Sequence, residues 1–162
     1  IERLSGERFR EVGLEIVAED EPASLETLAN YASARSWVAT DEDFDQLGYA
    51  LVDLVDGCAH VEQISVLPDY QGQGIGRALL DQVAGWAQQT RLQVVTLTTF
   101  AEVSWNRPLY EHLGFDVLPE TEIGPELMAV RSREAAHGLD PAIRVCMRLD
   151  LSRRGSTRHE KP

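Results

Sequence analysis

A glycine-rich segment near the middle of the chain has the composition of a phosphate-binding turn. Between an expected strand and an expected helix the chain reads Gln71-Gly72-Gln73-Gly74-Ile75-Gly76-Arg77. The first backbone N–H groups of a helix have no partner within the helix, and the helix dipole adds about half a positive charge there. Glycines let phosphate oxygens approach these N–H groups without a Cβ in the way, and the arginine adds a cation. The segment therefore predicts binding of a phosphate-bearing molecule.

Two other phosphate motifs do not fit this segment. A Walker loop requires Gly-Lys-Ser or Gly-Lys-Thr, which the chain lacks. A dinucleotide fingerprint begun at Gly72 requires glycine in place of Arg77, and one begun at Gly74 requires glycine in place of Leu79. What remains is Gln-x-x-Gly-x-Gly, for which a glycine-rich connection without a ligand is the alternative interpretation.

Composition and charge limit the partners of such a protein. The 162 residues suit one domain, expected at residues 1–151 and followed by a flexible polar tail at 152–162. A formal charge of −12 argues against general affinity for nucleic acid or an anionic membrane. No stretch reaches the roughly 20 apolar residues of a membrane span and no secretory leader is visible, so a cytoplasmic location is expected. The two cysteines, Cys58 and Cys146, are expected to be reduced thiols, and no metal site is expected.

Hydrophobic periodicity and turn residues predict the elements that position the glycine turn. The first half predicts a helix at 7–17, a short helix capped by Ser24, and strands at 37–40, 47–55 and 58–67. Asp56-Gly57 is expected to be a two-residue hairpin turn. The second half predicts helices from 75, at 107–113 and at 125–137, and strands at 94–99, 115–118 and 143–151. This order indicates an α/β fold, with a mixed central sheet and helices on both faces.

The glycine turn lies within a longer segment that resembles a known family. Residues 61–80, VEQISVLPDYQGQGIGRALL, resemble the signature segment of the GCN5-related N-acetyltransferases, the GNAT family. In the second half, Tyr110-Glu-His-Leu-Gly-Phe115 is similar to the family's Tyr-x-x-x-Gly-Phe segment. The order of the elements agrees with the family over about residues 5–151. The resemblance implies the GNAT fold, with acetyl-CoA as cosubstrate.

The resemblance also assigns roles to the backbone before and within the turn. Residues 71–77 would hold the pyrophosphate of acetyl-CoA through their N–H groups. The main-chain groups of Ile64, Ser65 and Val66 would run alongside the pantetheine like an added strand. The Ile64 N–H would polarise the thioester carbonyl, a catalytic role. The side chains of Ile64 and Val66 are expected to be ordinary core residues.

Tyr110 matches the family's tyrosine, whose hydroxyl protonates or hydrogen-bonds the leaving thiolate. A thiol has a pKa of about 8.5 and a phenol of about 10, so such a proton transfer is nearly balanced. A packed helix aromatic is the alternative interpretation of Tyr110. The family often has asparagine seven residues before this tyrosine, where this chain has Val103. Asn106, four residues before Tyr110, is expected either to reach the pantetheine or to cap the helix.

Two candidates for the base lie on the signature strand. His60 and Glu62 are two residues apart, which places both on one side of a regular strand, and both positions match places where family members carry a base. His60 has the more useful ordinary pKa, whereas Glu62 is also suited to holding a cationic acceptor. A polar surface pair without a catalytic role is the alternative, and the choice between the two residues stays open.

The resemblance implies an enzyme that moves an acetyl group from acetyl-CoA to a primary amine of a small molecule or peptide. Direct attack in a ternary complex is expected, and Cys58 is the alternative nucleophile of a ping-pong route. A non-catalytic acyl-CoA-binding sensor or interaction module with the same fold is the alternative function. The helix within residues 119–141 is expected to flank or cover the acceptor site. A homodimer is compatible with the resemblance.

Overall fold

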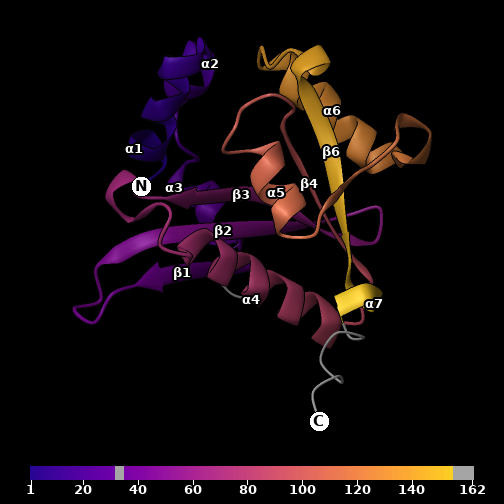
Figure 1. The fold of residues 1–162 in the computed structure, drawn as a ribbon, viewed down its shortest axis with the longest axis horizontal. Coiled ribbons are helices and arrows are strands. Elements are labelled where there is room, and N and C mark those ends of the chain that lie inside the picture. The colour runs from indigo at the N-terminus through magenta and orange to yellow at the C-terminus, as the bar shows by residue number, and fades with distance from the viewer. Residues whose placement is uncertain (32–34, 155–162) are drawn as a thin grey trace. The chain divides into compact units, whose positions relative to one another are not determined.

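A mixed six-stranded sheet is the framework of the molecule, as the sequence predicts. The computed structural model describes residues 1–31 and 35–154. Its strand order is β1-β2-β3-β4-β6-β5 (Figure 1). The strands are β1 (Ser36–Thr40), β2 (Gln46–Val55), β3 (Cys58–Val66), β4 (Val94–Phe100), β5 (Asp116–Val117) and β6 (Arg144–Asp150). The pairs β1–β2, β4–β6 and β5–β6 are antiparallel.

The helices follow the expected order, with changes at several ends. They are α1 (Glu2–Gly6), α2 (Glu15–Ala18), α3 (Leu25–Tyr31), α4 (Ile75–Gln89), α5 (Arg107–His112), α6 (Pro125–Ala136) and α7 (Leu151–Arg154). Four short 3₁₀ turns join them, namely η1 (Glu7–Val12), η2 (Pro68–Tyr70), η3 (Glu120–Glu122) and η4 (Pro141–Ile143). Helix α7 includes the first residues of the expected tail, and residues 155–162 lie outside the described part of the chain. No described helix is long and apolar enough to cross a membrane.

The expected continuous helix at 7–17 is wrong. A 3₁₀ turn ends at Gly13, whose φ of +73° is left-handed, and α2 begins only at Glu15. The Gly13 N–H bonds back to the Arg10 carbonyl, which is how a left-handed glycine ends a helical segment. The hydrophobic pattern continues through this break, so periodicity alone misses it.

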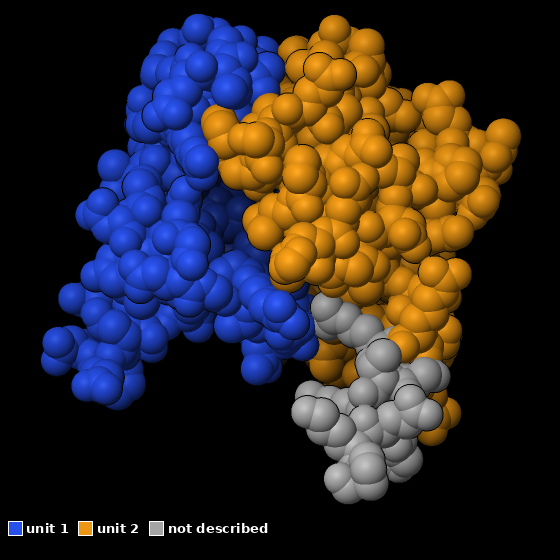
Figure 2. Space-filling model, viewed as in Figure 1, with its two compact units in different colours: residues 1–53, 61–82 blue, residues 54–60, 83–162 orange. Residues whose placement is uncertain are grey.

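The contacts of the chain group its residues into two compact units, coloured separately in Figure 2. Unit 1 comprises residues 1–53 and 61–82, and unit 2 comprises residues 54–60 and 83–162. The tip of the β2–β3 hairpin therefore belongs to unit 2. The expected two-residue turn at this tip is confirmed, because Asp56 and Gly57 have φ values of +49° and +70°. Two successive positive φ values are typical of the tight turn that suits the twist of a hairpin.

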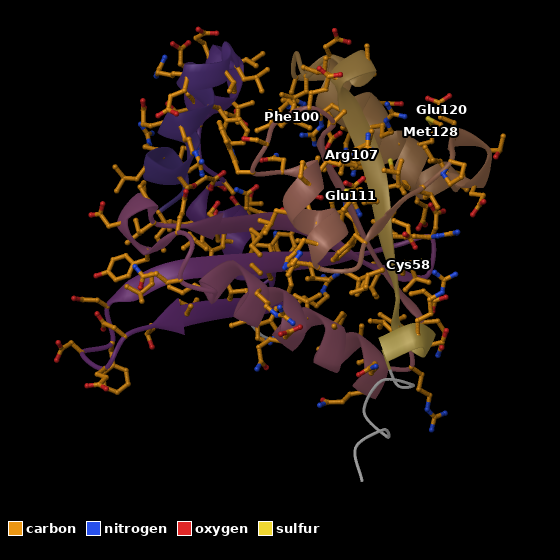
Figure 3. All side chains as sticks on the ribbon, in the orientation of Figure 1. Cys58, Phe100, Arg107, Glu111, Glu120 and Met128 are labelled. Atoms are coloured by element: carbon orange, nitrogen blue, oxygen red, sulfur yellow. The ribbon has the colours of Figure 1, made fainter. Side chains whose placement is uncertain are left out.

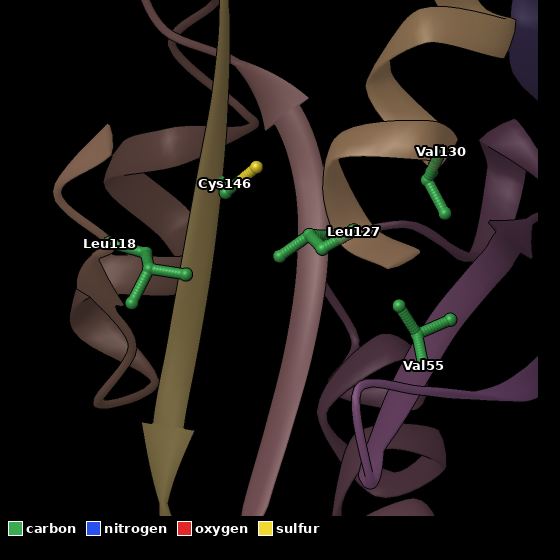
Figure 4. Packing of buried hydrophobic residues seen from close by; sticks show 5 residues of the cluster. All are labelled: Val55, Leu118, Leu127, Val130 and Cys146. Carbon is green, nitrogen blue, oxygen red and sulfur yellow. The ribbon is translucent and has the colours of Figure 1, made fainter. Parts of the chain in front are cut away.

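An apolar cluster in unit 2 fixes α6 on the sheet (Figure 4). It combines residues from β2, α6, β6 and the segment after β5, namely Val55, Leu118, Leu127, Val130 and Cys146. Each of these residues is less than a tenth exposed. Burial of such side chains contributes about 1.5–3 kcal/mol each, so the cluster holds α6 firmly.

The hairpin turn also caps the N-terminus of α6. The carboxylate of Asp56 accepts the N–H groups of Glu126 and Leu127 at 3.0 and 2.8 Å. In return, the Glu126 carboxylate accepts the N–H of Asp56. This is the reciprocal pattern of a capping box, made here between residues 70 apart in the chain.

Replacing Asp56 by glycine should lower the free energy of unfolding by about 1–2 kcal/mol, the usual contribution of a helix cap. Glycine adopts the positive φ of this turn freely, so the loss reports the cap rather than the turn. Urea unfolding at pH 7 measures it. Glu42→Ala, in the exposed β1–β2 turn, is the matched control and should stay within about 0.5 kcal/mol of wild type. An Asp56→Gly variant as stable as wild type would contradict the capping role.

Candidate active site

The segment from Cys58 to Leu67 has one more residue than the stretch of β2 from Leu47 to Val55. The two-residue turn places Val55 opposite Cys58, while the Leu67 N–H, just after β3, donates to the Leu47 carbonyl at 2.8 Å. Eight steps separate Leu47 from Val55 and nine separate Cys58 from Leu67, so the register shifts by one residue between Cys58 and Leu67. Such a shift leaves a residue out of the hydrogen-bond ladder, and irregularities of this kind are common beside active sites.

The glycine turn leads directly into the first turn of α4. Gly72 and Gly74 have φ values of +75° and +86°, the left-handed region that glycine adopts without strain. A Cβ built on either glycine would meet no atom within 4 Å, so the space beside the turn is open. Helix α4 is 15 residues long, and its first N–H groups point out of its N-terminus. Open space, free amides and a helix dipole together fit a diphosphate.

The side chains of the turn are occupied with holding it in shape. The Gln71 amide donates to the Val66 carbonyl and accepts from the Arg8 guanidinium, each at 3.1 Å. The Gln73 amide donates to the Asp69 carbonyl at 3.0 Å. The sequence analysis missed Arg8, because it is 63 residues from Gln71 and no local pattern connects them.

The one cation expected within the turn is exposed. The side chain of Arg77 is 63% exposed, and its Nε lies 3.8 Å from the Asp81 carboxylate on the next turn of α4. Exposed pairs of this kind contribute little to stability, so the guanidinium keeps its freedom to turn toward an anion.

The two candidates for the base have opposite environments. His60 is 1% exposed, and its Nδ1 lies 3.0 Å from the Thr96 hydroxyl on β4, itself buried. Glu62 is exposed. Its charge reaches Tyr31 and helps to raise the pKa of that phenol. Thr96 is a residue that sequence reasoning missed, since only the pairing of strands brings it to His60.

A polar cluster in unit 1 surrounds the hydroxyl of Tyr31. Asp53 accepts the Tyr31 hydroxyl at 2.8 Å and lies 3.4 Å from the Arg35 guanidinium. The guanidinium also lies over the Tyr31 ring, 5.9 Å from its centre. Burial, the bond to Asp53, and the charges of Asp53 and Glu62 raise the pKa of Tyr31. The cluster combines two carboxylates with one guanidinium, and no local sequence pattern predicts that Tyr31, Arg35 and Asp53 lie together.

Tyr110 is partly buried on α5, and its ring packs edge-on against Phe115 with 5.8 Å between ring centres. Burial raises the pKa of its phenol to about 12, and the charge of Arg144 opposes this rise. Asn106, before the first residue of α5, makes no side-chain cap. Its amide instead donates to the buried Thr99 hydroxyl at 2.9 Å, a contact that sequence reasoning also missed.

Neither cysteine has the environment of a nucleophile. The Cys58 thiol is partly buried, and burial and the Asp56 charge raise its pKa (Figure 3). Burial likewise raises the pKa of Cys146, which is 2% exposed. A raised pKa reduces the fraction of reactive thiolate at neutral pH. Within the described ranges, no group of three or more His, Cys, Asp or Glu side chains is arranged to hold a metal.

Helix α6 contacts the rest of unit 2 along its length. Beyond the Asp56 cap and the apolar cluster, the Arg131 guanidinium donates to the Pro141 carbonyl at 2.9 Å. Near the C-terminal end, Glu134 pairs with Arg144 of β6 at 2.6 Å, and both side chains are largely buried. These contacts hold α6 firmly in place within unit 2.

Comparisons with known proteins identify the family and the fold of this chain. Residues 5–115 match the family model described as the acetyltransferase (GNAT) family. The fold is similar to Rv2747 from Mycobacterium tuberculosis in complex with CoA and NLQ, at 25% identity and a TM-score of 0.60, over 79% of this chain and 82% of that one. It is also similar to the ribosomal-protein-S18-alanine N-acetyltransferase of Escherichia coli, at 25% identity and a TM-score of 0.57, over 82% and 80%. A GNAT-family acetyltransferase of Staphylococcus aureus, 16% identical, shares the fold with a TM-score of 0.66, over 93% and 89%.

The raised pKa of Tyr110 predicts a loss of stability at alkaline pH. Its folded pKa of about 12 exceeds the unfolded value near 10, so the neutral phenol stabilises the fold fully below pH 10. This contribution is lost as the pH rises through 12 and amounts to about 2 kcal/mol between pH 10 and 12. Urea unfolding at pH 9, 10 and 11 should show a shallower decline for Tyr110→Phe than for wild type.

Tyr70→Phe, in the turn η2, is the matched control and should decline as wild type does. Parallel declines for wild type and Tyr110→Phe would show that ionisation of Tyr110 is not coupled to folding.

Proposed function

The chain belongs to the acetyltransferase (GNAT) family and is an acetyl-CoA-dependent N-acetyltransferase, and from this premise we propose how it works and what it accepts. The acceptor is a primary amine of a small molecule or peptide, attacked directly in a ternary complex with acetyl-CoA. The observation that carries the proposal is the open, glycine-lined turn at the start of α4. It offers backbone N–H groups to a ligand.

Residues 71–77 would hold the pyrophosphate of acetyl-CoA through their N–H groups, with Arg77 as an added cation. The left-handed glycines and the open space beside them support this role. The main chain of Ile64, Ser65 and Val66 would pair with the pantetheine. The one-residue shift in register between Cys58 and Leu67 supports this assignment, because such a shift leaves main-chain groups outside the ladder. The Ile64 N–H would then hydrogen-bond the thioester carbonyl as negative charge develops on it.

In the transfer, the amine nitrogen forms a bond to the carbonyl carbon and the bond from that carbon to sulfur breaks. The amine loses a proton to a base, and the sulfur leaves as a thiolate that takes up a proton. Tyr110 would donate a hydrogen bond to this sulfur. Its pKa of about 12 lies about 3.5 units above that of a thiol, so complete proton transfer costs about 5 kcal/mol. The raised pKa therefore supports a hydrogen-bond donor rather than the nearly balanced proton donor expected from ordinary values.

Of the two candidates for the base, the environments favour Glu62. Its carboxylate is exposed, beside a cluster that includes Asp53. His60 is buried and engaged with Thr96. An exposed carboxylate can hold a cationic amine and receive its proton directly or through water. His60 would instead support the strand through Thr96.

The state of the cysteines supports direct attack. A covalent acyl-enzyme requires a thiolate, and both thiols have a raised pKa. The similarity to the ribosomal-protein-S18-alanine N-acetyltransferase of Escherichia coli supports including peptide amines among the acceptors. A panel of polyamines, aminoglycosides, amino acids and peptides, assayed by CoA release, tests the proposal. Tight binding of acetyl-CoA without turnover for any amine would favour the acyl-CoA sensor instead.

Replacing Gly74 by alanine should raise the Kd for CoA about tenfold or more, measured by calorimetry. The methyl group would occupy the space beside the turn and would strain a φ of +86°. Gly85→Ala is the matched control, because Gly85 lies in the interior of α4 with no atom within 4 Å of an added Cβ. It should leave the Kd unchanged, and equal affinities for the two variants would contradict the role of the turn.

Replacing Glu62 by glutamine should lower kcat/KM for the amine by about 100-fold at pH 7, the usual contribution of a general base. The deficit should shrink toward pH 10, where the free amine becomes abundant without help from the protein. His60→Gln is the comparison and should lower the thermal midpoint without this pH-dependent deficit. The reverse pattern would assign the base to His60.

A further inference from the structure

Helix α5, which carries Tyr110, is too short to be stable without support. It spans Arg107–His112, six residues with a proline in the first turn. Isolated helices shorter than about 12 residues are marginal in water, so contacts outside the helix must define its position. An ion pair from Arg107 to Glu111, 2.7 Å long, lies on its exposed side and contributes only a few tenths of a kcal/mol (Figure 3).

The start of α5 is tied to β4 by a partly buried side-chain hydrogen bond. The Asn106 amide donates to the Thr99 hydroxyl at 2.9 Å, and Thr99 is only 3% exposed. Asn106 has φ −110° and ψ −100° and makes no side-chain cap, so its amide is directed to the strand instead of the helix. Breaking this pair leaves one of the two polar groups without its partner, which is unfavourable because Thr99 is shielded from water.

Thr99 is a rigid support for this contact. It lies near the end of β4, in register with Val145 of β6, within a ladder of seven paired residues. The Arg144 guanidinium lies over the ring of the neighbouring Phe100, 4.6 Å from the ring centre. Arg144 also forms an ion pair with Glu134. The strand end therefore has little freedom to move.

The backbone carries this support directly to Tyr110. The Asn106 carbonyl accepts the Tyr110 N–H at 3.1 Å, which places Tyr110 one helical turn from the anchored residue. The Tyr110 carbonyl accepts the Phe115 N–H at 3.0 Å, and Phe115, 2% exposed, packs against the Tyr110 ring. Phe115 restrains the ring from one side, and the Asn106–Thr99 bond restrains the backbone from the other.

We propose that Thr99 and Asn106 are positioning residues that hold Tyr110 in place for acetyl transfer. The proposal rests on the role of Tyr110 given above. Asn106 then neither caps α5 nor needs to touch acetyl-CoA, because its amide is engaged by the strand. A displacement of 1 Å at a catalytic group can lower turnover by about 100-fold, so one lateral hydrogen bond suffices to matter.

The test replaces Thr99, which leaves Asn106 itself unchanged. Thr99→Val has the same shape without the hydroxyl, and Thr99→Ser keeps the hydroxyl as the matched control. Thr99→Val should lower kcat about tenfold while the KM for acetyl-CoA changes less than about twofold. Thr99→Ser should keep kcat within about threefold of wild type.

A double-mutant cycle separates positioning from general loosening of the structure. Tyr110→Phe alone should lower kcat by about 100-fold, and adding Thr99→Val should lower it by less than about twofold more. A full tenfold effect of Thr99→Val in both backgrounds, or no effect in either, would overturn the proposal. If Tyr110→Phe turns over as fast as wild type, Tyr110 has no role in the reaction, and this proposal fails with it. A wild-type protein that acetylates no amine instead overturns the proposed acceptor class.

Amide hydrogen exchange tests the anchor without turnover. The Tyr110 N–H, bonded to the Asn106 carbonyl, should exchange about tenfold faster in Thr99→Val than in wild type or Thr99→Ser. Equal exchange in all three proteins would show that the hydroxyl does not hold α5, and the proposal fails.

Discussion

Backbone amides at the start of α4 are the constraint on which the rest of the site depends. They bind an anion only if the chain before them leaves space, and two left-handed glycines provide that space. The amide side chains of Gln71 and Gln73 hold the turn from behind, by bonds to the Val66 and Asp69 carbonyls. The proposed recognition by the main chain would also make an acidic protein, with a formal charge of −12, compatible with a phosphate-bearing cosubstrate.

Burial determines the chemistry of three titratable groups of unit 2. It raises the pKa of Tyr110 and of both thiols, which favours neutral forms that donate hydrogen bonds over charged forms that attack or accept protons. Glu62, in unit 1, is exposed to solvent. In the proposed reaction the neutral phenol would stabilise the thiolate by a hydrogen bond, and the amine would reach Glu62 from solvent.

The parts of this structure that could be predicted from the sequence are those specified by neighbouring residues. The hairpin at Asp56-Gly57 and the cap at Ser24, whose hydroxyl accepts the Thr27 N–H, are local signals, and both are confirmed. The turn before α4 is of the same kind. Gly13 weakens the helix expected at 7–17, but the apolar period continues across it, so the sequence does not predict that the helix breaks there. The contacts of His60 and Asn106 could not be predicted, because strand pairing and helix docking bring their partners from 36 and 7 residues away.

The reciprocal contacts between Asp56 and Glu126 have a consequence for how the chain acquires its structure. The two partners are separated by 70 residues, a span that includes β3, α4, β4, α5 and β5. During synthesis the hairpin tip is made before α6. The Asp56 carboxylate can cap α6 only once the hairpin turn has formed. Such a distant closure raises contact order, which slows folding. The Asp56–Glu126 contacts can therefore form only after residue 126 has been synthesised and brought back to the hairpin tip.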